Sequence, residues 1–557
     1  MWSLSSEKEV IGKTVVRVFS TPMAGAGGGT QGAADVAALV QEVEDSIEPL
    51  SCDHNLAWWN VNTEATEENE RQRAETALAY SNRLADAEQF EAIVRARESG
   101  ANGPIGRRLD LLHDLMLPHQ VPASLRERIV ELETSVEGRF TRHRGVVRGD
   151  EVDDIEIKRI LRESDDVAER REAWEASKTV GAAVADDVRE LARLRNESAR
   201  ALGHRDWYAL SIAVSELDET KLFETLAACD KATAKPFARW KATLDRRLAE
   251  RFGCETAELR PWHYADPFFQ ETPPDGAVDL DPLFRERDIV ELGKQTFAGI
   301  GIDVEDTLAR SDLFPRAEKC QHAFCMDVDR AGDIRVLMNV TDNHDSMDTL
   351  LHELGHAVYS LGFDGALPWL LRDTHLITTE ASALLFGSLA GQRDWLVQVL
   401  GLDSAEAAAL ADKLRATRAA ELFVFTRWVL VMTGFERELY ANPDADLDDV
   451  WWKLVSRHQL VTPPDGRRAP DWAAKIHVAL APVYYHTYLY GSIVALQLQD
   501  ALRREAGGIV GTPAAGRILE ERLYAPGLAA RWDRLVMQAT GSPLSVDSLA
   551  REVSASH

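Results

Sequence analysis

The residues best suited to chemistry are His352 and His356, in the stretch His-Glu-Leu-Gly-His at positions 352–356. Four residues advance an α-helix by about 6 Å and slightly more than one turn, so both imidazoles leave the same face. Such a pair can hold a zinc ion at two points. Glu353 lies at the edge of that face, where its carboxylate can take a proton from a metal-activated water. The pattern therefore predicts a catalytic zinc site on a helix.

A catalytic zinc ion also needs a third protein ligand and an open position for water. Glu380 is the candidate, because it lies 24 residues after His356 in a stretch rich in Ala and Leu. Pro368 interrupts the chain between them, which leaves room for a turn and a returning helix. Asp345 or Ser346 is expected to cap the start of the first helix.

Composition limits the kinds of partner that this chain can have. Of its 557 residues, 91 are acidic and 63 are Lys or Arg, which gives a formal net charge of −28 and argues against nucleic acid as a partner. No apolar run approaches the roughly 18 residues of a membrane span. Five cysteines are few for this length and odd in number, so we expect no disulfide framework and a cytoplasmic location.

Helical spacing of apolar residues dominates the chain. We expect residues 1–34 to form a flexible leader, within which Met23 is a second possible start, and residues 35–557 to form one catalytic domain, since no linker or repeat interrupts them. The spacing predicts a mainly α fold. The predicted long helices are 35–47, 67–98, 124–139, 166–201, 219–252, 406–440 and 473–504.

Strand signals are scarce, and the clearest lies just before the zinc helix. Residues 322–328 and 334–340 predict a β-hairpin. The free edge of such a ribbon can pair with an extended peptide through main-chain hydrogen bonds. The alternative is a structural flap over the core.

A late cluster, 471–477 followed by 484–490, is rich in His and Tyr. Aromatic residues at this density often form part of the core, yet His and Tyr donors beside a metal can also stabilise an oxyanion.

Together with this cluster, several separated motifs resemble, in the same order along the chain, those of the peptidyl-dipeptidases related to angiotensin-converting enzyme. From about residue 55 onward the motifs are Trp59–Thr63, the region of Trp174, Cys320–Ala323, the zinc motif with Glu380, Trp451-Trp452, Pro463-Pro464, Ala474–His477, and Tyr485 with Tyr488. Thimet-type oligopeptidases share the metal motif and a similar Tyr-rich segment, and they remain rivals.

The resemblance implies a large helical ellipsoid with a deep central substrate channel, and it implies a role for each matching residue. These are the zinc ligands His352, His356 and Glu380; the general base Glu353; His477 and Tyr488, which stabilise the tetrahedral intermediate; Lys475 and Tyr485, which hold the substrate's terminal carboxylate; and His322 and Ala323, which bind substrate main chain.

The chain departs from the family pattern at several positions. Tyr264 aligns with a carboxylate-binding glutamine, and Leu384 stands where the family has an aspartate that supports the zinc ligands. The groups that orient those ligands must therefore differ here. One residue is also missing between His477 and Tyr488, which affects their relative placement.

Three functions are compatible with these residues. The leading one is a zinc peptidase that releases C-terminal dipeptides from short peptides. The second is an oligoendopeptidase of the thimet type with the same chemistry. The third is a non-catalytic peptide-binding protein with structural zinc, although such a site has no use for Glu353 and normally has four protein ligands. The oligomeric state is left open.

Overall fold

The protein is described here by a computed structural model that covers residues 31–273 and 278–555. Helices make up most of the described chain, which confirms the expected mainly α fold. The α-helices are α1 (Gln31–Thr63), α2 (Glu67–Leu84), α3 (Ala87–Glu98), α4 (Gly103–Met116), α5 (Ala123–Arg142), α6 (Asp154–Glu163), α7 (Val167–Ala201), α8 (Trp207–Val214), α9 (Glu219–Phe252), α10 (Asp281–Phe284), α11 (Ile289–Gly299), α12 (Glu305–Arg310), α13 (His344–Leu361), α14 (Leu376–Gly387), α15 (Arg393–Gln398), α16 (Ser404–Ala441), α17 (Leu447–His458), α18 (Ile476–Leu480), α19 (Tyr485–Ala506), α20 (Pro513–Leu519), α21 (Trp532–Thr540) and α22 (Asp547–Ala555).

Two of the predicted long helices are broken. The stretch 67–98 divides into α2 and α3 because Asp86 caps a new helix, its side chain accepting the N–H of Gln89. The stretch 473–504 divides into a 3₁₀ turn, α18 and α19. Between the last two, Val483 has a φ of 58°, a left-handed conformation that a β-branched residue rarely adopts and that no α-helix contains.

The expected leader falls mostly outside the described residues, which begin at position 31. Residues 31–34, placed in the leader by the sequence analysis, are helical and belong to α1. The division into a leader and one catalytic domain stays a prediction.

Two antiparallel ribbons supply the strands of the described chain. The predicted hairpin is confirmed, with strands shorter than expected, as β3 (Phe324–Asp327) and β4 (Ile334–Leu337). The other ribbon, β1 (Gly145–Val147) and β2 (Asp150–Val152), was not predicted. Its two-residue loop has φ values of 54° and 92°, both left-handed as in a type I′ hairpin turn, and its glycine was the available signal.

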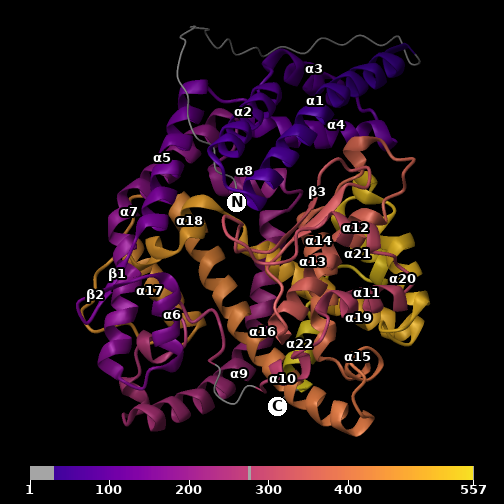
Figure 1. The fold of residues 1–557 in the computed structure, drawn as a ribbon. Coiled ribbons are helices and arrows are strands. Elements are labelled where there is room, and N and C mark those ends of the chain that lie inside the picture. The colour runs from indigo at the N-terminus through magenta and orange to yellow at the C-terminus, as the bar shows by residue number, and fades with distance from the viewer. Residues whose placement is uncertain (1–30, 274–277, 556–557) are drawn as a thin grey trace.

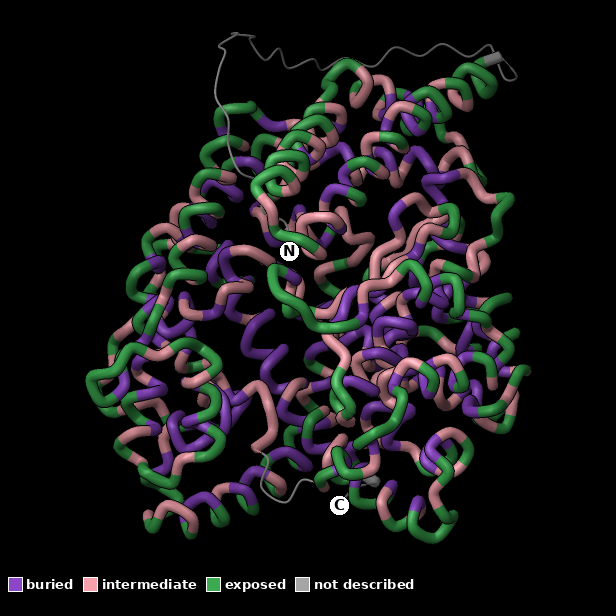
Figure 2. Tube along the Cα trace, viewed as in Figure 1, coloured by how far each residue is buried: buried purple, intermediate pink, exposed green. Residues whose placement is uncertain are grey.

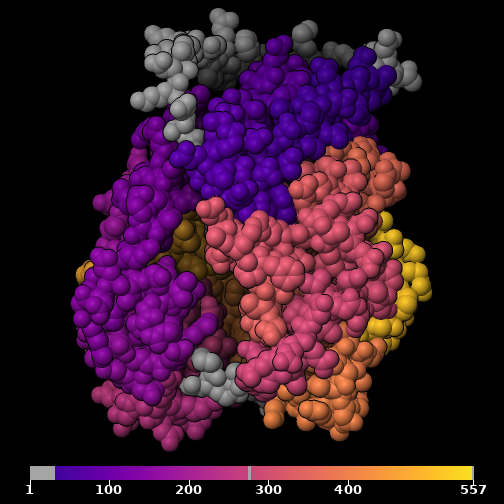
Figure 3. Space-filling view, in the orientation of Figure 1, coloured from indigo at the N-terminus to yellow at the C-terminus, as the bar shows by residue number. Residues whose placement is uncertain are grey.

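The elements are arranged around a hollow. Figure 1 shows α1 to α4 across one end, α5 to α7 along one side, the segment from β3 to α15 along the other side, and α16 crossing between them. Buried residues gather in the interior around α13, α14, α16 and α19 (Figure 2). The space-filling view shows the surface hollowed between the two sides (Figure 3). In the described chain, no helix is both long enough and apolar enough to cross a bilayer.

Two glycines let three helices meet closely at the zinc motif. A Cβ on Gly355 of α13 would lie 2.7 Å from the Cα of Ala383 in α14. A Cβ on Gly491 of α19 would lie 2.8 Å from the Cβ of Glu380. Both distances are too short for real Cβ contacts, so glycine is required for this packing. The Ser382 hydroxyl then donates to the carbonyl of Gly355 at 2.8 Å, which ties α14 to α13.

Candidate active site

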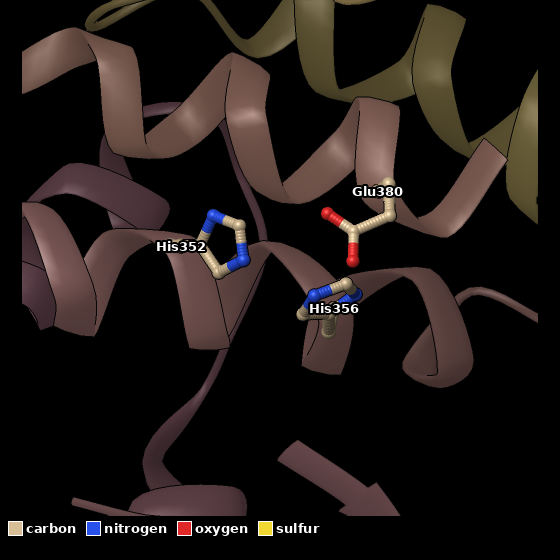
Figure 4. Close-up of side chains that lie close together, drawn as sticks. All are labelled: His352, His356 and Glu380. Carbon is tan, nitrogen blue, oxygen red and sulfur yellow. The ribbon is translucent and has the colours of Figure 1, made fainter. Parts of the chain in front are cut away.

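The three expected zinc ligands come together at the contact of α13 and α14. One ligand atom from each of His352, His356 and Glu380 lies within 4.8 Å of the others. In Figure 4 both imidazoles rise from α13, and the Glu380 carboxylate points toward His356 from α14. The cap of α13 differs from the expectation: Asn343, not Asp345 or Ser346, accepts the N–H of Ser346. The helix therefore starts slightly earlier, with the ligand register unchanged.

The protonation chemistry of this group fits a divalent cation. Burial lowers the pKa of His352 to about 4 and that of His356 to about 3, so both imidazoles are neutral and able to act as ligands. Burial also raises the pKa of Glu380 to about 7. A buried carboxylate without a positive partner is costly, and a metal ion between these three groups would remove that cost.

Thr379 is a supporting residue that the sequence analysis did not identify. The expected family aspartate is replaced by Leu384, whereas the Thr379 hydroxyl lies 2.7 Å from Nδ1 of His356. When Nδ1–H donates to this hydroxyl, Nε2 carries the lone pair that a metal needs. Thr379 directly precedes Glu380. The same turn of α14 therefore carries the ligand Glu380 and the hydroxyl that orients the ligand His356.

We expect Thr379→Val to weaken zinc binding about 10- to 100-fold, because the substitution keeps the shape of the side chain and removes its hydrogen bond to His356. Competition with a zinc chelator measures this directly. Thr378→Val is the matched control, since the Thr378 hydroxyl is hydrogen-bonded to Tyr359 and to the carbonyl of His375 and to none of the three zinc ligands. Equal zinc affinity in wild type and Thr379→Val would contradict the assignment.

The outer edge of β3 faces the zinc motif. The outer edge of β4 is covered, because the N–H of Asp312 donates to the carbonyl of Val336 at 2.9 Å. Cys325 is opposite Val336 in the register, and the backbone groups of such a non-bonded pair point away from each other. The N–H and C=O of Cys325 therefore point out of the ribbon, and no described strand pairs with that edge.

Glu353 lies between this edge and the zinc ligands. Burial raises its pKa to about 8 and the negative charge of Glu380 adds to the rise, while the backbone N–H of Cys325 opposes it. A divalent cation would counter the first two effects and favour the ionised base. The sequence reasoning placed Glu353 beside the metal, and the strand contact is an addition from the structure.

His322 and Ala323 directly precede β3. His322 is exposed and Ala323 is half-buried. Continuing the register places the backbone groups of Ala323 on the outer edge as well, two residues before Cys325. Both residues are therefore accessible to an extended chain at this edge.

Two tyrosines of the late cluster face the zinc ligands. Burial raises the pKa of Tyr488 to about 12, with the charge of Glu380 contributing. The pKa of Tyr484 rises from the same causes, and the two rings lie 5.0 Å apart. Tyr488 was expected at the metal and Tyr484 was not singled out. Two neutral phenol donors thus lie on the Glu380 side of the site.

Lys475 forms the second polar centre of the site. Its Nζ donates to Oε1 of Gln270 at 2.8 Å and lies 5.8 Å from the ring of Tyr485. Burial lowers the pKa of Lys475 to about 8. The alignment that placed Tyr264 at the family's glutamine is wrong, because the Tyr264 hydroxyl bonds Lys241 instead and Gln270 lies beside Lys475.

His477 lies with this second centre. Its ring is 5.1 Å from that of Tyr485, whose ring is 5.9 Å from that of Tyr488. Burial lowers the pKa of His477 to about 4, and the positive charge of Lys475 adds to the shift. Its buried Nδ1 has no hydrogen-bond partner among the described residues. His477 is thus a neutral imidazole in a row of rings that leads from Lys475 toward the zinc ligands.

Sequence comparison agrees with this geometry over both halves of the chain. Residues 30–257 match the family described as angiotensin-converting enzyme, and residues 304–554 match peptidase family M3. With two histidines of an HExxH helix and a downstream glutamate brought together, the chain is a zinc metallopeptidase of the HExxH-plus-glutamate class.

More specifically, it is a zinc peptidase whose residues 30–257 are similar to angiotensin-converting enzyme, the family whose motifs the sequence resembles. Peptides are its substrates, and the non-catalytic alternative no longer applies. The zinc motif itself lies in the part that matches family M3, so the chain combines features of two related families.

Proposed function

We propose that this peptidase releases dipeptides from the C-terminus of short peptides. The observation that carries the proposal is the pair of Lys475 and Gln270, joined at 2.8 Å next to Tyr485. A buried ammonium, an amide and a phenol are together suited to a carboxylate, which can accept hydrogen bonds from all three. Because Tyr485 begins α19 and Tyr488 follows one turn later, this centre lies about one helical turn from Tyr488, the tyrosine that faces the zinc ligands.

The catalytic residues have two roles, proton transfer and stabilisation of the negative charge of the intermediate. When bound, zinc supplies a Lewis acid that lowers the pKa of a water ligand to about 7. Glu353 takes the proton of the attacking water and returns it to the leaving amine. Tyr488 and His477 donate hydrogen bonds to the oxyanion of the tetrahedral intermediate. His322 and Ala323 hold the substrate main chain along the outer edge of β3.

We expect Lys475→Met to weaken selectively the cleavage of peptides with a free C-terminus. A hydrogen bond to a charged group contributes about 1.5 to 3 kcal/mol, so kcat/KM for such peptides should fall by roughly 10- to 150-fold. The corresponding C-terminal amides should already be poor substrates and should change little. Paired kinetics on free and amidated forms of one peptide measure the effect.

Lys453→Met is the matched control, because Lys453 is a largely exposed lysine on α17 whose ammonium pairs with Asp449 and not with the Lys475 centre. Cleavage of free and amidated peptides at the same rate, with Lys475→Met affecting both alike, would contradict the proposal.

The second candidate is an oligoendopeptidase of the thimet type. The match of residues 304–554 to peptidase family M3, which includes the zinc ligands and the tyrosine cluster, favours it. Mass spectrometry of the products from peptides of graded length separates the two. Release of a dipeptide from the C-terminus of every peptide supports the first proposal. Internal cuts whose distance from either end varies between peptides support the second.

The proposal also includes a position for the substrate channel and a cellular location. The hollow in Figure 3 is proposed as the substrate channel, because α13, α14 and α19, which carry the zinc ligands and the Tyr485 that lies beside Lys475, pack together in the interior. A reducing, cytoplasmic location is proposed from the five cysteines, which are all unpaired thiols.

A further inference from the structure

A cavity of about 510 Å³ adjoins the zinc motif. His352 and Glu353 form part of its wall, so it is continuous with the catalytic groups. Along α16, Trp428 lies 5.8 Å from Tyr485 in the Lys475 centre, and Phe425, one turn earlier, lines the cavity. None of the residues Lys475, Gln270 and Tyr485 lines the cavity, so the cavity is separate from the Lys475 centre.

The walls nearest the catalytic groups are apolar. Leu384 follows the zinc ligand Glu380 by one turn of α14, and Phe425 lies 6.2 Å from the ring of Tyr488. Leu422 and Leu496 complete this part of the lining. An aliphatic chain that enters from the zinc site would pack against these side chains.

The far part of the cavity is acidic. Asp348 lies one turn before His352 on α13, and Glu421 lies one turn before Phe425 on α16. Both carboxyl groups line the cavity, and burial raises the pKa of each. The Asp348 side chain nevertheless keeps 39% of its surface accessible, and its Oδ1 lies 3.6 Å from Nε2 of His344, too far for a hydrogen bond. Neither carboxyl group is hydrogen-bonded to a Lys or Arg side chain among the described residues.

Arg418 is the only Lys or Arg in this lining, whereas Asp348, Glu421 and Glu552 are acidic. Its positive charge lowers the pKa of both Asp348 and Glu421, which favours their ionised forms. It forms no ion pair with either of them in the described structure. Arg418 beside the two carboxylates Asp348 and Glu421 leaves this part of the cavity with an excess of negative charge when both are ionised.

We propose that this cavity is a substrate subsite for a lysine or arginine side chain that adjoins the scissile bond. The apolar walls would cover the aliphatic stem, and Asp348 and Glu421 would pair with the charged end. The inference rests on the proposed peptidase function and adds a preference for basic peptides to it.

The test uses peptides that differ at a single position. The two positions that flank the scissile bond are varied one at a time. At each, lysine is compared with norleucine, its neutral straight-chain analogue, and with glutamate, using the zinc-loaded enzyme. At one of these positions kcat/KM should be about tenfold or more higher for lysine than for norleucine, the effect of a charged hydrogen bond. Glutamate at that position should be the poorest of the three.

Variants identify the residues responsible. Glu421→Gln and Asp348→Asn should each reduce the lysine-to-norleucine ratio severalfold, a ratio that is independent of the fraction of folded enzyme. Asp412→Asn is the matched control, because Asp412 lies on α16 with a largely exposed side chain outside the cavity and should keep the ratio. Arg418→Met should increase the ratio, since it removes the competing positive charge.

Equal rates for lysine, norleucine and glutamate at every position would overturn the subsite while leaving the peptidase intact. A preference for glutamate that is lost in Arg418→Met would also overturn it, by showing that the cavity selects acidic side chains. Failure of the zinc-loaded enzyme to cut any peptide in the set would instead contradict the proposed function.

Discussion

Replacement of Glu353 by glutamine is expected to lower kcat by about 10²- to 10⁴-fold while zinc stays bound. Glutamine keeps the size of the side chain and an oxygen that can accept the N–H of Cys325, but it cannot take a proton from water. The loss should therefore appear in kcat more than in KM, because peptide binding along β3 is unchanged. Steady-state kinetics with parallel elemental analysis for zinc measure both quantities.

The zinc content of Glu353→Gln serves as the internal control. Near-normal activity with full zinc would remove Glu353 from the mechanism and leave the reaction without its general base. Loss of zinc together with activity would show that Glu353 stabilises the metal site and would make the kinetic result uninformative about proton transfer, so Glu353→Asp would then be compared.

Replacement of Glu380 by glutamine is expected to abolish stoichiometric zinc binding and to reduce activity at least as far as the loss of Glu353. Glu380 is the only anionic ligand of the three, and a catalytic site with two neutral histidines alone is incomplete. A bound metal stabilises the native state by mass action, about 2.7 kcal/mol at a concentration 100 times its Kd. Zinc should therefore raise the melting temperature of the wild type but not that of the variant.

Differential scanning calorimetry of both proteins, with and without zinc, measures this effect. The variant also removes a buried carboxyl group whose pKa is raised to about 7, so its metal-free form should be no less stable than metal-free wild type. An equal zinc-dependent shift in the two proteins would show that Glu380 is not a ligand.

Much of the catalytic centre could be predicted from spacing alone. The separation of His352 and His356 matches one helical turn, and the same register occurs in α13 even though its cap is Asn343. Glu380 was identified because a third ligand is a chemical requirement, and a returning helix after Pro368 could carry it.

Contacts between distant loops could not be read from the sequence. Gln270 meets Lys475 across 205 residues, from an irregular segment where Phe269 has a left-handed φ of 50°. Such a segment has no period that fixes its alignment, which is why Tyr264 was placed there incorrectly. Thr379 was missed for a different reason: a threonine on an apolar helix has no distinctive signal until its neighbour is known.

The helix breaks show the same limit at the level of local structure. Apolar spacing continues through Asp86 and through Val483, so periodicity alone favours uninterrupted helices at both places. The first is broken by a side-chain cap and the second by a left-handed turn that the N–H of Val483 helps to hold by donating to Glu436 at 2.8 Å. Both depend on hydrogen bonds that compete with the helix and that hydrophobic spacing does not report.

The most direct test of the account is a zinc titration of metal-free protein with hydrolysis as the readout. Zinc is removed with a chelator, the protein is shown by elemental analysis to be free of metal, and the rate of peptide cleavage is measured as zinc is returned. The account predicts no cleavage at the start and a rise that levels off at one zinc ion per chain. Full cleavage by the zinc-free protein, or no cleavage once zinc is bound, would contradict it.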